Sequence, residues 1–281
     1  MAGHIDHTES FDDFLEADGL REETERLALQ SLKKRRHLRT LLTATLILLS
    51  LAILLTLGTW QVERLHWKEG LLADIAERRA AAPVSLAEIE QRAAAGDDIE
   101  YRRIALSGTF DHTKERHFFA TFEGRTGFHI YTPLMLADDR IIFVNRGFVP
   151  YEMKEPATRA EGEVAGEQTI TGYARAKLPG KPSMLVPDND LSKNIFYWKD
   201  LDAMAASTGL TDVIPFFVDA DASVANPGGW PKGGVTQFDL PNNHLQYAAT
   251  WYGLAAALLA VVFAMWWRSR KLAPSPAGEG R

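Results

Sequence analysis

Two uncharged apolar stretches of equal length, residues 40–60 and 247–267, constrain the fold more than any other feature of this 281-residue sequence. A helix of about 21 residues rises roughly 31 Å, which matches the hydrocarbon thickness of about 30 Å that a membrane helix must cross. A cleaved signal peptide has a shorter apolar core followed by small residues, whereas the first stretch ends in Trp60 and Gln61. The sequence therefore predicts two retained transmembrane helices.

Basic residues flank each apolar stretch on the side nearer the chain end. Those before the first stretch are Lys33, Lys34, Arg35, Arg36 and Arg39, and those after the second are Arg268, Arg270 and Lys271. Because basic flanks stay in the cytoplasm, we expect a multi-pass protein of a bacterial inner membrane with both termini cytoplasmic. The predicted parts are an acidic-then-basic tail (1–39), the first span (40–60), a periplasmic domain (61–246), the second span (247–267) and a cytoplasmic tail (268–281).

The central region carries 20 Lys and Arg against 27 Asp and Glu, a net charge of −7, so no basic field indicates nucleic-acid binding. The chain has no cysteine. That absence excludes disulfides, thiolate metal sites, cysteine nucleophiles and covalently attached c-type haem. In the acidic N-terminal tail, the leucine spacing from Leu20 to Leu32 predicts a solvated helix preceded by a disordered segment, and no chemistry is assigned to His4 or His7.

From Tyr101 onward, short runs of β-branched and aromatic residues are bounded by Gly, Pro and Asp, a pattern typical of short strands. The predicted strands are residues 102–110, 116–122, 128–136, 140–149, 168–175, 215–220 and 235–240. A helix is expected to continue past the first span to the region of Pro83, with two short helices after the Ser85 capping box and the Asp200 N-cap. We therefore predict a mostly antiparallel β domain with a few helices, built as a small barrel or sandwich between the two spans.

No constellation of residues in the sequence indicates an enzyme. There is no nucleophile elbow, phosphate-binding loop or His-Glu-x-x-His motif. His112, His117 and His129 could in principle share a metal, but Lys114 and Arg116 would oppose a cation there. We interpret these histidines as polar residues on strands and in a connection.

The second span holds more chemical information than the β domain. His244, Tyr247, Ala248 and Trp251 share a helix face with Ala255 and Leu258, because they follow steps of three and four residues. An imidazole at the aqueous end, aromatic rings and small residues suit a flat apolar macrocycle with a metal at its centre. Arg64 and Lys68 could bind its acidic groups, although snorkelling toward lipid headgroups explains both residues as well. Ala249, Gly253 and Ala257 form a small-residue stripe that would permit close helix contact.

Three motifs resemble the surfeit locus protein 1 family. They are Leu57-Gly58-Thr59-Trp60-Gln61-Val62-Glu63-Arg64 with Trp67-Lys68, Val144-Asn145-Arg146-Gly147-Phe148-Val149-Pro150, and Asn243-His244-Leu245-Gln246-Tyr247 with Thr250-Trp251-Tyr252-Gly253-Leu254. Together with lesser matches they run in the family's order from Gly58 to Leu254, between the two predicted spans.

The resemblance implies a non-catalytic assembly factor of cytochrome c oxidase that binds haem a and assists its insertion into subunit I. It implies a haem-iron ligand role for His244, with Tyr247, Trp251, Arg64 and Lys68 as candidate neighbours, and partners that include subunit I and haem a synthase. It transfers no ligand role to the Asn145-Arg146-Gly147 motif, where Arg146 is expected in an ion pair. The alternative is a cofactor-free, membrane-anchored scaffold that binds subunit I or another assembly partner.

Overall fold

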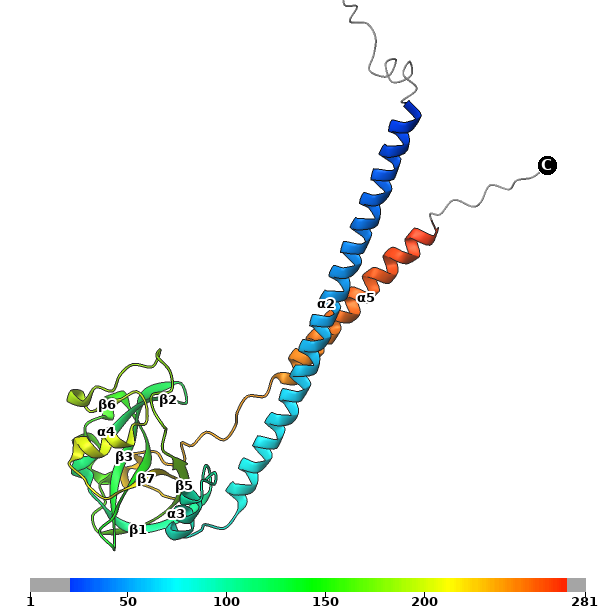
Figure 1. Cartoon of the computed structure of the whole chain (residues 1–281). Coiled ribbons are helices and arrows are strands. Elements are labelled where there is room, and N and C mark those ends of the chain that lie inside the picture. Colours follow the sequence, from blue (N-terminus) through cyan, green and yellow to red (C-terminus); the bar gives the residue numbers. More distant parts are fainter. Residues whose placement is uncertain (1–20, 272–281) are drawn as a thin grey trace, which may run out of the picture. The chain divides into compact units, whose positions relative to one another are not determined.

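The computed structural model describes residues 21–271, which form two compact units (Figure 1). The helical unit contains the described residues up to Lys68 and those from Asn242 onward, and the β unit spans Glu69–Pro241. Helix α2 (Arg21–Ala80) is continuous for 60 residues, and helix α5 (His244–Lys271) for 28. Within the described residues, these two helices are long and apolar enough to cross a membrane, which is consistent with a membrane anchor.

Apolar side chains point outward along both long helices. Leu48 is 66 % exposed and Leu49 is 56 % exposed on α2, and Val261 and Phe263 are more than half exposed on α5. Exposed apolar surface of this extent is consistent with a membrane anchor. The helix α2 passes through the predicted first span and the predicted continuation without a break. Leu20 and the tail before it, with His4 and His7, lie outside the described residues.

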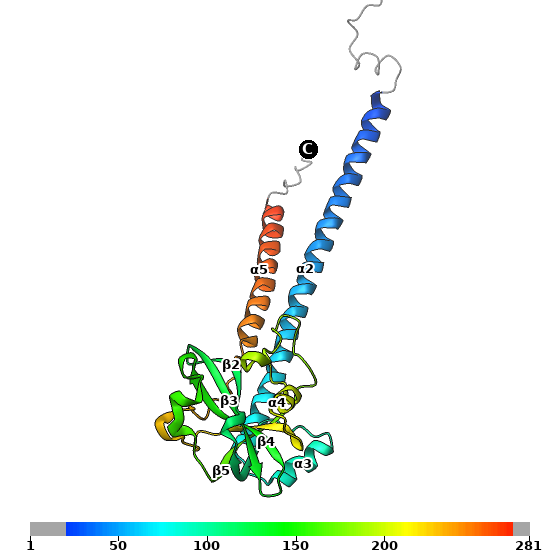
Figure 2. The same cartoon turned by 90° about the vertical axis from the view of Figure 1, so that its left-hand side faces the viewer.

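Seven strands form the sheet of the β unit, and Figure 2 labels several of them. They are β1 (Arg103–Phe110), β2 (Arg116–Phe122), β3 (Arg125–Leu136), β4 (Ile141–Pro150), β5 (Glu167–Ala176), β6 (Ile195–Phe196) and β7 (Val213–Ala220). The strand order is β1-β5-β7-β4-β3-β2-β6, and an additional pairing of β1 with β3 closes a five-stranded barrel. All pairs are antiparallel except β4–β7 and β2–β6. The predicted mostly antiparallel barrel is therefore confirmed.

Closure of the barrel depends on Gly108. Strand β1 pairs with β5 along residues 103–109 and with β3 from Gly108 to Phe110, so the strand changes partner at this glycine. A Cβ atom at Gly108 would collide with the carbonyl oxygen of Met135 on β3. Only a residue without a side chain permits that close approach of two backbones.

The alternation of side chains along β4 and β7 builds two apolar layers. Val144 and Val218 belong to the larger core, which helix α3 (Leu86–Ala94) covers through the fully buried Ile89. Phe143 and Phe217 point to the opposite face, where they pack with Met204 of helix α4 (Leu201–Thr208). Because both faces are covered, β4 is buried along its whole length.

Most predicted local signals are present. Asp200 accepts a hydrogen bond from the Ala203 N–H and so caps α4. The Ser85 hydroxyl accepts from the Glu88 N–H at 3.3 Å, but the Glu88 carboxylate pairs with Arg92 instead of returning to Ser85. Only half of the predicted capping box forms, because an i,i+4 ion pair competes for the carboxylate.

The predicted strand over 235–240 is wrong. This segment has no strand pairing in the structure, and it is held by its side chains instead. The Phe238 ring packs against Tyr101 and Tyr173 with centroid distances of 5.6 and 4.9 Å, and the Arg79 guanidinium lies 3.9 Å from the same ring. The two-residue strand β6, which pairs with β2, was not predicted because so short a strand has no alternation of its own.

Candidate functional site

Helix α5 packs against α2 through one face that carries His244, Ala248, Trp251 and Ala255. Ala248 and Ala255 are the two buried residues of α5, at 2 and 3 % exposure, while His244 and Trp251 are partly buried. These positions are three or four residues apart, as expected for one side of a helix. The predicted shared face is therefore present, except that Tyr247 lies at its outer edge and is 55 % exposed.

The predicted small-residue stripe does not make this contact. Ala249, Gly253 and Ala257 are exposed, and a Cβ atom at Gly253 would meet nothing within 4 Å. Close approach occurs instead at Gly58 of α2, where a Cβ atom would lie 2.9 Å from the Tyr252 ring. The stripe is one helical position away from the contact face, and the spacing of its residues alone could not exclude it.

The imidazole of His244 is held by Gln61. Its Nδ1 lies 2.7 Å from the Gln61 Oε1 atom, and Gln61 is only 9 % exposed on α2. An amide oxygen can only accept, so in this arrangement Nδ1–H donates and Nε2 carries the free lone pair. Nε2 has no hydrogen-bond partner within residues 21–271. This is the arrangement in which a histidine binds a metal through Nε2 while a second residue fixes its ring.

A second contact fixes the same part of the helix pair. The Thr59 Oγ1 and Tyr252 hydroxyl oxygens are 3.1 Å apart, and the Tyr252 ring covers Gly58. Since Thr59 and Gln61 are two residues apart on α2, both hydrogen bonds must form with one relative position of the helices. Tyr252 and Gln61 therefore set the position of His244 along α2.

Two cations on α2 follow Gln61 on the same side of the helix. Arg64 and Lys68 lie three and seven residues beyond Gln61, which places all three on one face. The Arg64 guanidinium lies 4.1 Å from the Trp67 ring centroid. Neither Arg64 nor Lys68 forms an ion pair with any residue in 21–271, so both charges are available to an anion or to lipid headgroups.

The donor set fits a haem on chemical grounds. It contains one imidazole with a free Nε2, a hydrogen-bond acceptor for the other ring nitrogen, aromatic neighbours and two unpaired cations. His66 is exposed and lies five residues from Gln61, which places it away from the contact face. His37, the other histidine of α2 in the described helical unit, is also exposed, so His244 is the histidine of this unit that lies on the contact face.

The three histidines of the β unit do not form a metal site. Pairing of β2 with β3 places His117 opposite Ile130 and His129 opposite Phe118, so the two histidines point to opposite faces of the sheet. Within residues 21–271, no group of three or more His, Cys, Asp or Glu side chains could hold a metal.

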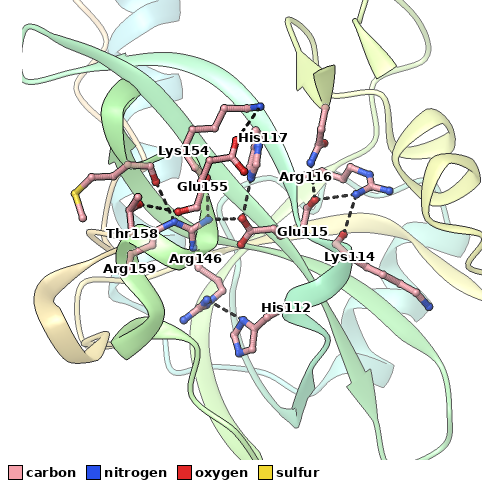
Figure 3. A network of polar contacts seen from close by, with 12 residues as sticks. His112, Lys114, Glu115, Arg116, His117, Arg146, Lys154, Glu155, Thr158 and Arg159 are labelled. Atoms are coloured by element: carbon pink, nitrogen blue, oxygen red, sulfur yellow. Dashed lines mark hydrogen bonds and ion pairs between the residues drawn. The ribbon is translucent and has the colours of Figure 1, made fainter. Parts of the chain in front are cut away.

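His117 and His112 belong instead to a buried polar network, which Figure 3 shows. Glu115 accepts from Arg159 and lies 2.8 Å from His117 Nε2. Although burial opposes it, the hydrogen bond from His117 and the charge of Arg159 lower the Glu115 pKa. The network joins the start of β2 to the segment after β4, and three of its buried atoms, Glu115 Oε2, His117 Nδ1 and Arg159 Nη1, have no hydrogen-bond partner within residues 21–271.

The Asn145-Arg146-Gly147 motif also forms buried polar contacts that join separate segments of the β unit. Arg146 donates to the Gly162 carbonyl and to Asn226 Oδ1, with a further contact to His112 Nδ1. Arg146 forms no ion pair within the described residues, so that expectation was wrong: neutral oxygens satisfy the guanidinium. Burial lowers its pKa to about 10. Asn145 donates to the buried Asp219 at 2.9 Å.

Comparison with known proteins shows the family of this chain. The SURF1 family model matches residues 48–256, which include both helix segments of the site and the whole barrel. The chain belongs to the SURF1 family. The surfeit locus protein 1 of Takifugu rubripes is 38 % identical over 229 residues, covering 74 % of this chain and 90 % of the relative. The proteins of the same name from Rattus norvegicus and Homo sapiens are 41 and 38 % identical and cover 72 % of this chain, and 68 and 70 % of the relatives.

Sequence reasoning had singled out His244 in this SURF1-family chain but not Gln61. Gln61 appeared only as the residue that follows Trp60 at the end of an apolar stretch and as one member of the first resemblance motif, with no role assigned. A polar residue on the same face as Arg64 and Lys68 was the available signal. Its pairing with His244 depends on how the two helices lie against each other, and the two residues are 183 positions apart in the sequence.

Proposed function

We propose that this SURF1-family chain is an assembly factor for cytochrome c oxidase that binds haem a and assists its insertion into subunit I. The observation that carries the proposal is the His244–Gln61 pair, which leaves Nε2 free at the end of an apolar helix pair. Haem a is the cargo of such a factor, and the role is one of binding and transfer without catalysis. Subunit I and haem a synthase are the proposed partners.

Each residue near His244 has a proposed task. His244 would provide an axial ligand to the haem iron, and Gln61 would fix the orientation of the ring by accepting from Nδ1–H. Trp251 and the exposed Tyr247 would supply aromatic surface. Arg64 and Lys68 would offer their unpaired charges to the haem propionates.

We further propose that both termini are cytoplasmic and that the barrel lies in the periplasm of a bacterial cell. The basic residues before the first apolar segment and Arg268, Arg270 and Lys271 after the second support this orientation. The exposed apolar side chains of α2 and α5 support burial of these helices in the inner membrane.

Complementation of a strain that lacks the gene tests this function. Wild type and the His66→Ala control, which alters an exposed histidine of the same helix pair, are expected to restore oxidase with full haem content. His244→Ala is expected to restore little, although the protein accumulates in the membrane. Oxidase with full haem content from the His244→Ala strain would favour the alternative, a cofactor-free scaffold that binds subunit I.

A further inference from the structure

The β unit contains a pocket that takes no part in the site on the helix pair. Its volume is about 400 Å³, and its walls come from β2, β3, β5, β7 and the segment 235–240. A pocket of this size accommodates a small molecule. Phe118 and Phe122 provide apolar wall, while His129, Lys199 and Asp219 provide polar groups.

The anionic part of the pocket is already satisfied. Asp219 is buried and accepts from Asn145, from Arg175 at 3.1 Å and from Thr236 at 3.3 Å. Arg175 also donates to Glu100 at 2.8 Å. Although burial opposes it, the charges of Lys199 and Arg175 and the Asn145 hydrogen bond lower the Asp219 pKa, so this residue remains a carboxylate. With its oxygens occupied, Asp219 has little capacity to bind a cation.

Three other polar groups in and beside the pocket have no partner. Lys199 forms no hydrogen bond or ion pair within residues 21–271, and its Nζ lies 5.7 and 5.6 Å from the ring centroids of Phe118 and Tyr131. The buried Nδ1 of His129 and the buried hydroxyl of Tyr131 also lack hydrogen-bond partners within these residues. Unpaired buried polar groups are costly, and a ligand that satisfies them regains that cost.

The position of His129 depends on a local irregularity. The pairing of β3 with β4 shifts register between His129 and Tyr131, and such bulges redirect side chains next to binding sites. Burial and the charge of Lys199 lower the His129 pKa to about 4, so the ring is neutral near pH 7. Lys199 is therefore the unpaired cation of the pocket, and His129 adds a neutral hydrogen-bonding group.

We propose that this pocket binds a monocarboxylate with an apolar body, whose carboxylate contacts Lys199 and His129 and whose apolar part lies against Phe118 and Phe122. The balance of charges around the pocket disfavours a dianion. The formal charges of four side chains in and beside the pocket, Lys199, Arg175, Asp219 and Glu100, sum to zero. A dianionic phosphate would therefore add two uncompensated negative charges near the buried carboxylate of Asp219. A carboxylate in contact with Lys199 adds only one negative charge, and Arg175 shields the Asp219 carboxylate from it.

Titration of the full-length protein in lipid nanodiscs at pH 7 tests this proposal. The probes are benzoate, its neutral isostere benzamide and the dianion phenyl phosphate, measured by ligand-observed NMR against empty nanodiscs. Wild type is expected to bind benzoate at one saturable site, at least about tenfold more tightly than either other probe, which is the worth of one charge-assisted contact. Equal binding of benzamide, or no saturable binding of benzoate, would overturn the proposal with wild type alone.

Variants locate the binding site. Lys199→Met is expected to weaken benzoate binding at least about tenfold, whereas Lys193→Met, which removes a 70 % exposed lysine paired with Asp190, is expected to leave it unchanged. Unchanged binding in a folded Lys199→Met protein would refute the assignment. A tripeptide with a C-terminal Phe and its amidated form then distinguish where the bound carboxylate comes from. Tighter binding of the free-acid peptide than of both its amide and benzoate indicates a polypeptide C-terminus. Tighter binding of benzoate indicates a free small molecule.

Discussion

Replacement of Gln61 by Leu isolates the contribution of the residue that positions His244. The substitution preserves the bulk of the side chain and removes the acceptor that lies 2.7 Å from His244 Nδ1. The loss of a partner for a partly buried N–H costs about 1–3 kcal/mol. Loss of an outer hydrogen bond to a metal-binding histidine typically reduces metal affinity by about 10- to 100-fold, so a decrease within this range is expected for haem a.

The assay is spectrophotometric titration of the purified membrane protein with haem a. Thr59→Val is the matched control, because it removes the neighbouring interhelical hydrogen bond to Tyr252 without touching His244. The control is expected to bind haem a within about threefold of wild type, since an exposed hydrogen bond contributes only about 0.5–1.5 kcal/mol to the helix contact. If Gln61→Leu binds haem a as tightly as the control does, the inferred role of Gln61 is refuted.

Three further outcomes are expected. Gly58→Leu should separate α2 from α5, because even a Cβ atom would lie 2.9 Å from the Tyr252 ring, and reduced disulfide cross-linking between cysteines introduced into the two helices would reveal it. Asp219→Ala should lower the free energy of unfolding of the barrel by about 3–5 kcal/mol, because Arg175 loses a buried partner; denaturant titration with unchanged stability would contradict this. The His129 side chain takes up a proton near pH 6.5 in the unfolded protein but only near about pH 4 in the folded protein. The free energy of unfolding of wild type should therefore fall by up to about 3 kcal/mol as the pH decreases between these values. Unfolding curves measured over this pH range should show a smaller pH dependence for His129→Asn.

The strands were predictable where β-branched and aromatic residues are concentrated in one segment. Residues 116–122 and 168–175 have this composition, and the structure places β2 and β5 there with ends that differ by at most one residue. The segment 235–240 has a similar composition but forms no ladder. Its Phe238 is held between Tyr101 and Tyr173, and no local pattern encodes such a contact.

The candidate site was predictable in part for a related reason. Helical spacing alone places His244 and Trp251 on one face, because that relation is local. The partner of His244 depends on how α5 lies along α2, and no pattern within either helix specifies that Gln61 faces it. The pocket around Lys199 was out of reach for the same reason, since its residues come from four strands and three connecting segments that only closure of the barrel brings together.

The visible absorption spectrum of the purified protein, produced together with haem a synthesis, tests the central claim most directly. Wild type, His244→Ala and the exposed-histidine control His66→Ala would be compared at equal protein concentration after circular dichroism has shown equal helix content. Wild type and His66→Ala are expected to show a haem a band that is weakened or shifted in His244→Ala. A colourless wild type, or an unchanged band in His244→Ala, would contradict it.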